Sequence, residues 1–174
     1  MTVAPLAPEF SRVVTLDDLG ATPQVLRLVA SEAERAALAL RFDLIAIDRL
    51  EATATVRRIG TDAGVAVEAE FSAAVVQRCI LTLEPAPAEI SGGFAAELLV
   101  EIEDAAEEID LDPLRDDEPE PLVDRRVDVG ELVAEYMCLE LDPYPRAPGA
   151  VLEAPAEERE PSPFAVLASF RQNP

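Results

Sequence analysis

The sequence predicts a single α+β domain with an antiparallel sheet, open or barrel-like, two main helices and a short C-terminal helix. The 174 residues suit one domain, and 49% of them are hydrophobic, so the chain has enough apolar material for a core. Two long stretches alternate apolar and polar residues, as half-buried strands do. Two helix N-cap patterns each precede an amphipathic stretch. We expect the domain at 10–150, an N-terminal tail at 1–9 and a flexible acidic, Pro-rich tail at 151–174.

The N-terminal part predicts one strand and one helix. Phe10–Leu16 is rich in β-branched residues and is followed by turn-forming residues, which favours a first strand. The residues between this strand and Ser31 are interpreted as a short loop. Ser31 followed by Glu34 is a capping-box pattern, and acidic residues are favourable at a helix N-terminus. We therefore expect a helix at about 32–42.

The middle of the chain predicts three strands. Small and β-branched residues run from Leu50 to Ile59, and a hairpin across Gly60–Gly64 connects them to a longer alternating segment. The apolar face of this second strand comprises Val65, Val67, Ala69, Phe71, Ala73, Val75, Cys79 and Leu81. Its polar face comprises Glu68, Glu70, Ser72, Arg78 and Thr82. Its length exceeds that of an ordinary strand, which suggests a β-bulge or a strongly coiled strand. From Ile90 to Ile102 the alternation repeats and predicts a further half-buried strand.

Residues 103–120 are predicted to form a solvated, mobile acidic loop. From Glu101 to Glu120, 11 of 20 residues are acidic and only Arg115 is basic, so self-repulsion opposes packing. The charge of the whole chain is uneven, with −6 on residues 1–100 and −15 on residues 101–174 within a total of −21. Such a field repels phosphate and attracts basic partners. Solubility alone explains the charge equally well.

The C-terminal part predicts a short strand, the second main helix and a tail. Leu122–Val127 favours a strand, and Asp128 with Glu131 forms a helix-cap pattern. The buried stripe of this helix comprises Val129, Leu132, Val133, Tyr136, Met137 and Leu141. Prolines end the helix, and a flexible acidic linker leads to a short apolar helix at Pro163–Arg171. This last helix either docks onto the domain or recognises a groove in a partner.

The residue inventory favours binding over catalysis. The chain has no His and no Lys, which removes the commonest general base, Ser–His and Cys–His nucleophiles, and Schiff-base chemistry. The residue types still permit a Mg²⁺-dependent catalytic site made of carboxylates. However, the densest acidic cluster lies in the predicted mobile loop, whereas catalysis requires a fixed geometry. We expect Cys79 to be a buried structural thiol and Cys138 to be partly exposed. Two thiols without His cannot complete a tetrahedral zinc site unless carboxylates also contribute ligands, so we predict no metal, cofactor or catalytic residue.

Candidate binding residues come from the acidic loop, the arginine pairs and the C-terminal segment. The pairs Arg57–Arg58 and Arg125–Arg126 lie at strand ends and could contact phosphate, although ion pairs with neighbouring acids are the more frequent arrangement. The candidate partner-binding residues are Asp116, Asp117, Glu118, Arg125, Arg126, Tyr144, Arg146, Phe164 and Leu167.

The N-terminal residues and the apolar runs predict a cytoplasmic protein. MTVAPLAPEFSRVV lacks a basic segment followed by an apolar stretch, so we expect no secretory signal. Charged residues interrupt every apolar run well short of the roughly 20 residues of a membrane-spanning helix. All 14 cations are Arg, and a composition rich in Ala, Arg and Pro without Lys is typical of GC-rich bacterial genes.

Two motifs of the sequence carry a family resemblance: VQRCILTLEP at 76–85 and VDRRVDVGELVAEYMCLELDPYPRAPGA at 123–150. They resemble the YceD family of bacterial proteins, which is associated with accumulation of the 23S ribosomal RNA. The resemblance extends over about 10–150, because three further segments also match: the intervening IDLDPL, an FSRVVTL-like strand and the SEAERAALALRF helix. Many family members have further cysteines that look able to bind a metal, whereas here only Cys79 matches. The resemblance implies a role in synthesis, processing or stability of 23S ribosomal RNA and brings no catalytic residue.

Charge and resemblance together lead to one main hypothesis. We expect a non-enzymatic accessory factor for large-subunit assembly, whose acidic C-terminal half binds a basic ribosomal protein or assembly factor and affects RNA indirectly. Direct RNA contact through the arginine pairs is the first alternative. A carboxylate-metal ribonuclease is the second.

Overall fold

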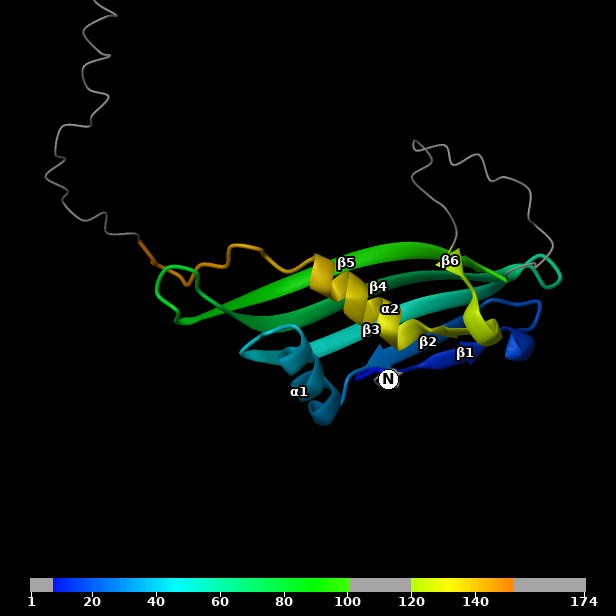
Figure 1. Cartoon of the computed structure of the whole chain (residues 1–174), viewed down its shortest axis with the longest axis horizontal. Helices are drawn as coiled ribbons and strands as arrows, with labels where there is room; N and C mark the ends of the chain where they lie inside the picture. Colours follow the sequence, from blue (N-terminus) through cyan, green and yellow to red (C-terminus); the bar gives the residue numbers. More distant parts are fainter. Residues whose placement is uncertain (1–7, 101–119, 152–174) are drawn as a thin grey trace, which may run out of the picture.

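The structure is a computed structural model that describes residues 8–100 and 120–151 (Figure 1). Within these ranges the chain forms two α-helices and seven strands, which confirms the α+β class. The predicted acidic loop at 103–120, except Glu120, and the predicted C-terminal helix at Pro163–Arg171 lie outside the described residues. No helix in the two described ranges combines the length and the apolar character that crossing a membrane requires.

The main sheet has five strands in the order β2-β3-β4-β5-β6. Their bounds are Gln24–Val29, Ala46–Ile59, Gly64–Arg78, Pro85–Leu99 and Glu120–Pro121. The pairs β2–β3, β3–β4 and β4–β5 are antiparallel, whereas β6 pairs parallel to β5. Among the described strands the sheet stays open, so the barrel-like form is not confirmed.

The β3–β4 hairpin confirms the predicted turn, but its bulge lies on β3 rather than on the longer second strand, where the alternation suggested it. Gly60 adopts a φ of 58°, the left-handed conformation that glycine tolerates best. The pairing shifts register between Ile47 and Arg49, which leaves Asp48 as the extra residue. β4 is 15 residues long, and its core-facing side chains alternate with more exposed ones as predicted.

Both main helices begin where their caps predict. Helix α1, Glu32–Arg41, has a complete capping box in which Ser31 Oγ accepts from the Glu34 N–H. Helix α2, Val129–Leu139, is capped by the Asp128 side chain and lies across one face of the sheet (Figure 1). The Phe94 ring on β5 stacks on the Tyr136 ring of α2 with centroids 4.1 Å apart. The two helices of the sequence prediction are thus confirmed.

Strand β2 is an element that the sequence analysis missed, since those residues were interpreted as a loop. Six residues pair with β3, from Gln24 opposite Val56 to Val29 opposite Glu51. Val25 and Val29 are exposed at 66% and 51% on the face away from the core, while Leu28 is buried. Apolar residues on both faces of an edge strand remove the alternation that would have identified it.

Two predicted strands are shorter than expected. The segment Phe10–Leu16 contributes only β1, Val13–Thr15, which pairs with β7, Arg126–Asp128, in a separate two-stranded sheet. A strand over the whole of Leu122–Val127 is wrong, because a 3-10 turn occupies Val123–Arg125. Within it, Asp124 and Arg125 have φ values of 52° and 57°, which a strand cannot accommodate.

The core has one large and one small cluster. The large cluster lies between α2 and the sheet and includes the fully buried Phe10, Leu16, Leu50 and Met137. The small cluster contains Cys79, Ala86 and Ala147 at the end of the sheet where β4 turns into β5. This end of the sheet carries the motif at 76–85 and the last residues of the motif at 123–150.

Candidate functional site

The turn between β4 and β5, residues Cys79–Glu84, closes with two backbone hydrogen bonds. The Cys79 N–H donates to the Glu84 carbonyl at 2.9 Å, and the Leu83 N–H donates to the Cys79 carbonyl at 3.0 Å. Leu83 has a φ of 62° and its side chain is 67% exposed. A large apolar residue in the left-handed region and in solvent carries backbone strain, a feature that is frequent at functional sites.

The segment after α2, residues 140–151, returns to this turn and is called the strap here. The Ile80 N–H donates to the Pro145 carbonyl at 2.9 Å, and Gln77 Nε2 donates to the Asp142 carbonyl at 2.9 Å. Ala147 of the strap is buried against Cys79. The structure therefore joins the motif at 76–85 to the end of the motif at 123–150.

The Cys79 thiol is the most perturbed polar group of this junction. Its side chain is fully buried, as predicted, although the residue follows β4 rather than lying within it. Hydrogen bonds lower its pKa to about 6, first from the Ala147 backbone and then from the side chain and N–H of Thr82, the latter 3.4 Å from Sγ. These donors outweigh burial, which acts in the opposite direction.

We expect burial rather than pKa to control the reactivity of Cys79. In the native protein at pH 7.5, iodoacetamide should alkylate the partly exposed Cys138 at least about tenfold faster than Cys79. The buried Cys79 can react only when the surrounding structure unfolds locally. Peptide mass spectrometry over time measures both rates. In urea the two rates should become similar. Faster labelling of Cys79 in the native state would show instead that its thiolate is accessible.

The surface of the junction combines exposed apolar and cationic residues. Ile80 and Tyr144 are 44% and 69% exposed, and they belong to segments that the Ile80–Pro145 hydrogen bond holds together. Arg78 and Arg146 are also exposed, and neither forms an ion pair within the part of the chain that the structure describes. Two predicted binding residues, Tyr144 and Arg146, thus lie beside this turn. Ile80 was not predicted, since a single apolar residue in a turn gives no periodic signal.

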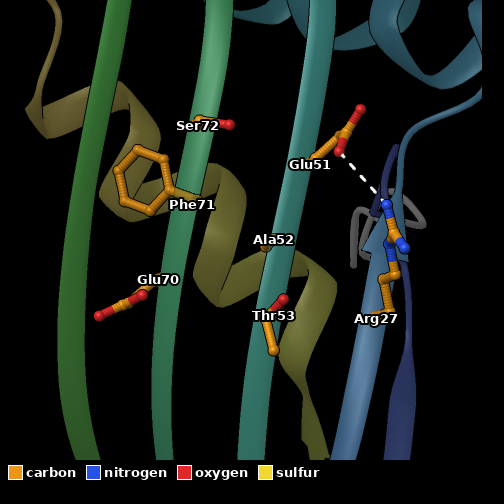
Figure 2. A pocket seen from close by; sticks show the side chains of 7 residues that line it. All are labelled: Arg27, Glu51, Ala52, Thr53, Glu70, Phe71 and Ser72. Atoms are coloured by element: carbon orange, nitrogen blue, oxygen red, sulfur yellow. Dashed lines mark ion pairs between the residues drawn. The ribbon is translucent and has the colours of Figure 1, made fainter.

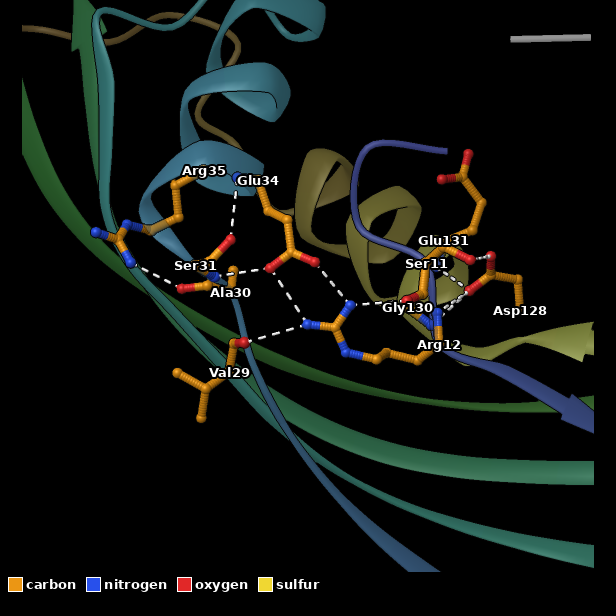
Figure 3. Close-up of polar contacts among 10 residues, drawn as sticks. All are labelled: Ser11, Arg12, Val29, Ala30, Ser31, Glu34, Arg35, Asp128, Gly130 and Glu131. Carbon is orange, nitrogen blue, oxygen red and sulfur yellow. Dashed lines mark hydrogen bonds and ion pairs between the residues drawn. The ribbon is translucent and has the colours of Figure 1, made fainter. Parts of the chain in front are cut away.

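A polar network anchors the start of α2 to the N-terminal segment (Figure 3). Asp128 Oδ1 accepts from the backbone N–H groups of Arg12, Gly130 and Glu131 at 2.6, 3.1 and 3.2 Å, and Oδ2 accepts from Ser11 Oγ at 2.5 Å. One carboxylate therefore caps the helix and positions residues 11–12 at the same time.

The same network reaches α1 through an ion pair. The Arg12 guanidinium donates to both Glu34 carboxylate oxygens at 2.7 and 3.2 Å and to the Val29 carbonyl at 3.4 Å (Figure 3). These hydrogen bonds, helped by those from Ser31, lower the pKa of Glu34 to about 2. The carboxylate therefore stays ionised at any physiological pH, and the network is structural.

The arginines of the two predicted pairs, Arg57–Arg58 and Arg125–Arg126, are mostly engaged with carboxylates or carbonyls. Arg125 Nη2 lies 2.7 Å from Asp17 and 2.8 Å from Asp62. Arg57 is 3.6 Å from Glu97, and Arg58 donates to two carbonyls in the loop after β1 at 2.8 and 2.7 Å. Arg126 is exposed on β7 and forms no ion pair with another described residue. The pairs do not form one shared phosphate site.

The remaining predicted binding residues, Asp116, Asp117, Glu118, Phe164 and Leu167, lie outside the described residues. Within residues 8–100 and 120–151, no group of three or more His, Cys, Asp or Glu side chains is arranged as a metal-ion site.

Comparison with known proteins gives one family. The model of the YceD family, described as large ribosomal RNA subunit accumulation protein YceD, matches residues 67–171. This range contains β5, the Cys79 turn, α2 and the strap, together with most of β4. No curated protein and no solved structure matches the chain. Because the match covers more than half of the 174 residues, the chain belongs to the YceD family.

Proposed function

We propose that this protein is a non-enzymatic, cytoplasmic accessory factor that supports 23S ribosomal RNA accumulation and large-subunit assembly by binding a basic protein partner. Membership of the YceD family supports the ribosomal part of the proposal, since the family is described by accumulation of large-subunit ribosomal RNA. The nature of the partner is argued from charge.

The observation that carries the choice of partner is the pairing of the arginines. The described residues contain 11 of the 14 arginines, and seven of these 11 form ion pairs with carboxylates. The same residues contain 21 Asp and Glu, so their net charge is −10. Phosphate-binding surfaces present many free cations. A surface with mostly neutralised cations and an excess of carboxylates favours a basic protein instead.

The partner can be identified by affinity capture of the tagged full chain from lysate of the source bacterium. We expect a basic ribosomal protein or assembly factor at about 50 mM salt and much less of it at about 500 mM, because screening weakens attraction between exposed charges. The capture should persist after nuclease treatment. Loss of all ribosomal proteins on nuclease treatment would favour the direct RNA alternative, and no ribosomal or assembly protein at either salt would overturn the proposal.

The ribosomal role itself has a genetic test. Deletion of the gene is expected to lower 23S relative to 16S ribosomal RNA, as measured by electrophoresis of total RNA, and the full chain supplied from a plasmid should restore the ratio. A ratio that deletion leaves unchanged would contradict the role.

A further inference from the structure

The sheet has a second face, away from α2, and the residues at its centre, Thr53, Glu68, Glu70 and Gly93, are exposed. Alternation along β4 buries Val67, Ala69 and Phe71 on the side of the helix and directs Glu68 and Glu70 to the other side. The side chains of β2 to β5 that point away from α2 form the surface called the open face here.

Two adjoining hollows lie on the open face. The first is lined by Arg27, Glu51, Thr53, Glu70 and Ser72, with the backbone of β3 and β4 as its floor (Figure 2). The second is lined by Thr53, Thr55, Glu68, Glu70, Gly93 and Ala95. Thr53 and Glu70 belong to both, so the hollows form one shallow depression across the centre of the sheet. Small side chains make this depression accessible to a ligand.

Arg27, Arg49 and Arg57 on the open face are already engaged with carboxylates, whereas Arg78, at the end of β4, forms no ion pair with a described residue. The N–O separations are 3.9 Å for Arg27–Glu51, 2.6 Å for Arg49–Glu89 and 3.6 Å for Arg57–Glu97. These pairs use carboxylates on β3 and β5 and leave those of the central strand β4 without a cation.

Glu68 and Glu70 are therefore the unneutralised charges of the depression. Neither forms an ion pair with any residue in the described part of the chain. Their register neighbours are uncharged: Thr55 and Ala95 flank Glu68, and Thr53 and Gly93 flank Glu70. The nearest cations, Arg27, Arg49 and Arg57, are paired with other carboxylates, so Glu68 and Glu70 leave a net negative charge at the centre of the face.

We infer that the open face docks a basic, extended segment of the protein partner, with two cationic side chains of that segment over Glu68 and Glu70. This inference rests on the proposed function. The two glutamates are two residues apart on a strand, so their side chains are spaced by about 6.6 Å. An extended segment running along β4 presents every second side chain at the same spacing. Exposed Val25 and Val29 on β2 offer apolar contacts at the rim.

Charge complementarity selects this occupant over the others. Residues 101–119 and 152–160 of the same chain carry 14 Asp and Glu against two Arg, so the face repels them, and residues 1–7 and 161–174 offer only Arg171 rather than two spaced cations. A second copy would bring the same negative face, and RNA would bring phosphates. A basic protein segment is the partner whose charge matches the depression.

A peptide assay tests the face directly. The probe is a fluorescein-labelled peptide that alternates Arg and Thr over eight residues, followed by fluorescence polarisation against the full chain at low salt. We expect Glu68→Gln with Glu70→Gln to weaken binding at least about tenfold, since both facing charges are lost. The matched control is Glu32→Gln with Glu135→Gln, which removes the same charge from two exposed sites off the open face. It should change binding less than about twofold. Equal effects of the two variants would show that only net charge matters and would overturn the inference.

The natural partner provides the second test. A benzophenone amino acid at Thr53 should cross-link the basic protein recovered by affinity capture, and the E68Q/E70Q variant should capture less of it than wild type. Undiminished capture by E68Q/E70Q, or a cross-link to RNA or to the chain's own C-terminal segment, would overturn the docking surface while leaving the proposed function intact. Failure of wild type to capture any basic ribosomal or assembly protein would remove the proposed function itself.

Discussion

Replacement of Gly130 by alanine is expected to lower the free energy of unfolding by more than about 3 kcal/mol. A Cβ at this position would lie 2.1 Å from the Phe10 carbonyl oxygen and 3.0 Å from the Arg12 backbone nitrogen. Both obstacles are backbone atoms, and the Phe10 ring is fully buried, so the N-terminal segment cannot move aside without opening the core. Helix propensity alone predicts that Gly130→Ala raises the free energy of unfolding, since alanine is favoured over glycine within a helix by about 1 kcal/mol.

Urea unfolding followed by circular dichroism measures this effect. The matched control is Gly20→Ala, because a Cβ at Gly20 meets no atom within 4 Å. We expect that control to change stability by less than about 0.5 kcal/mol. A urea midpoint for Gly130→Ala at or above that of wild type would show that helix propensity dominates. It would also show that the first turn of α2 is not packed tightly against the N-terminal segment.

Local signals in the sequence were sufficient where the structure depends on neighbours in the chain. Ser31 and Glu34 predicted the start of α1, and Asp128 predicted the start of α2, because capping is a contact within one turn. The alternation along β4 also predicted that Glu68 and Glu70 lie on the polar face. Periodicity and caps therefore located the helices, the long strands and the polar face.

Distant contacts determine the parts that the sequence did not reveal. The left-handed backbone at Arg125 is accompanied by ion pairs to Asp17 and Asp62, which lie 108 and 63 residues away, so a strand at Leu122–Val127 was the reasonable but wrong expectation. The junction of the Cys79 turn with the strap likewise depends on tertiary hydrogen bonds. Both arrangements require the fold to be known.

The open face shows the same limit at the level of charge. Sequence alone could not show that Arg27 pairs with Glu51 on the adjacent strand, or that Arg49 and Arg57 of β3 reach across β4 to carboxylates on β5, because these pairs depend on strand order and register. Once Thr53 and Gly93 are known to flank Glu70, this carboxylate is seen to have no cation beside it. A candidate binding surface follows from pairing geometry rather than from composition.

Replacement of Asp128 by alanine is expected to lower the free energy of unfolding by about 3 kcal/mol. Loss of a helix N-cap accounts for about 1 kcal/mol. The Arg12 N–H and the Ser11 hydroxyl then lose their acceptor in a partly buried place, which costs a further 1–3 kcal/mol. Thermal and urea unfolding of the full chain measure the total.

Asp128→Asn is the matched control, since its amide oxygen can still accept from the N–H groups of Arg12, Gly130 and Glu131 and its amide nitrogen can donate to Ser11. We expect this variant to lose less than about 1 kcal/mol, because asparagine is also a good N-cap. Equal and small losses in both variants would mean that the network contributes little. A large loss confined to Asp128→Ala would show that α2, inside the family match at 67–171, depends on N-terminal residues outside that match, so the matched region would not be expected to fold alone.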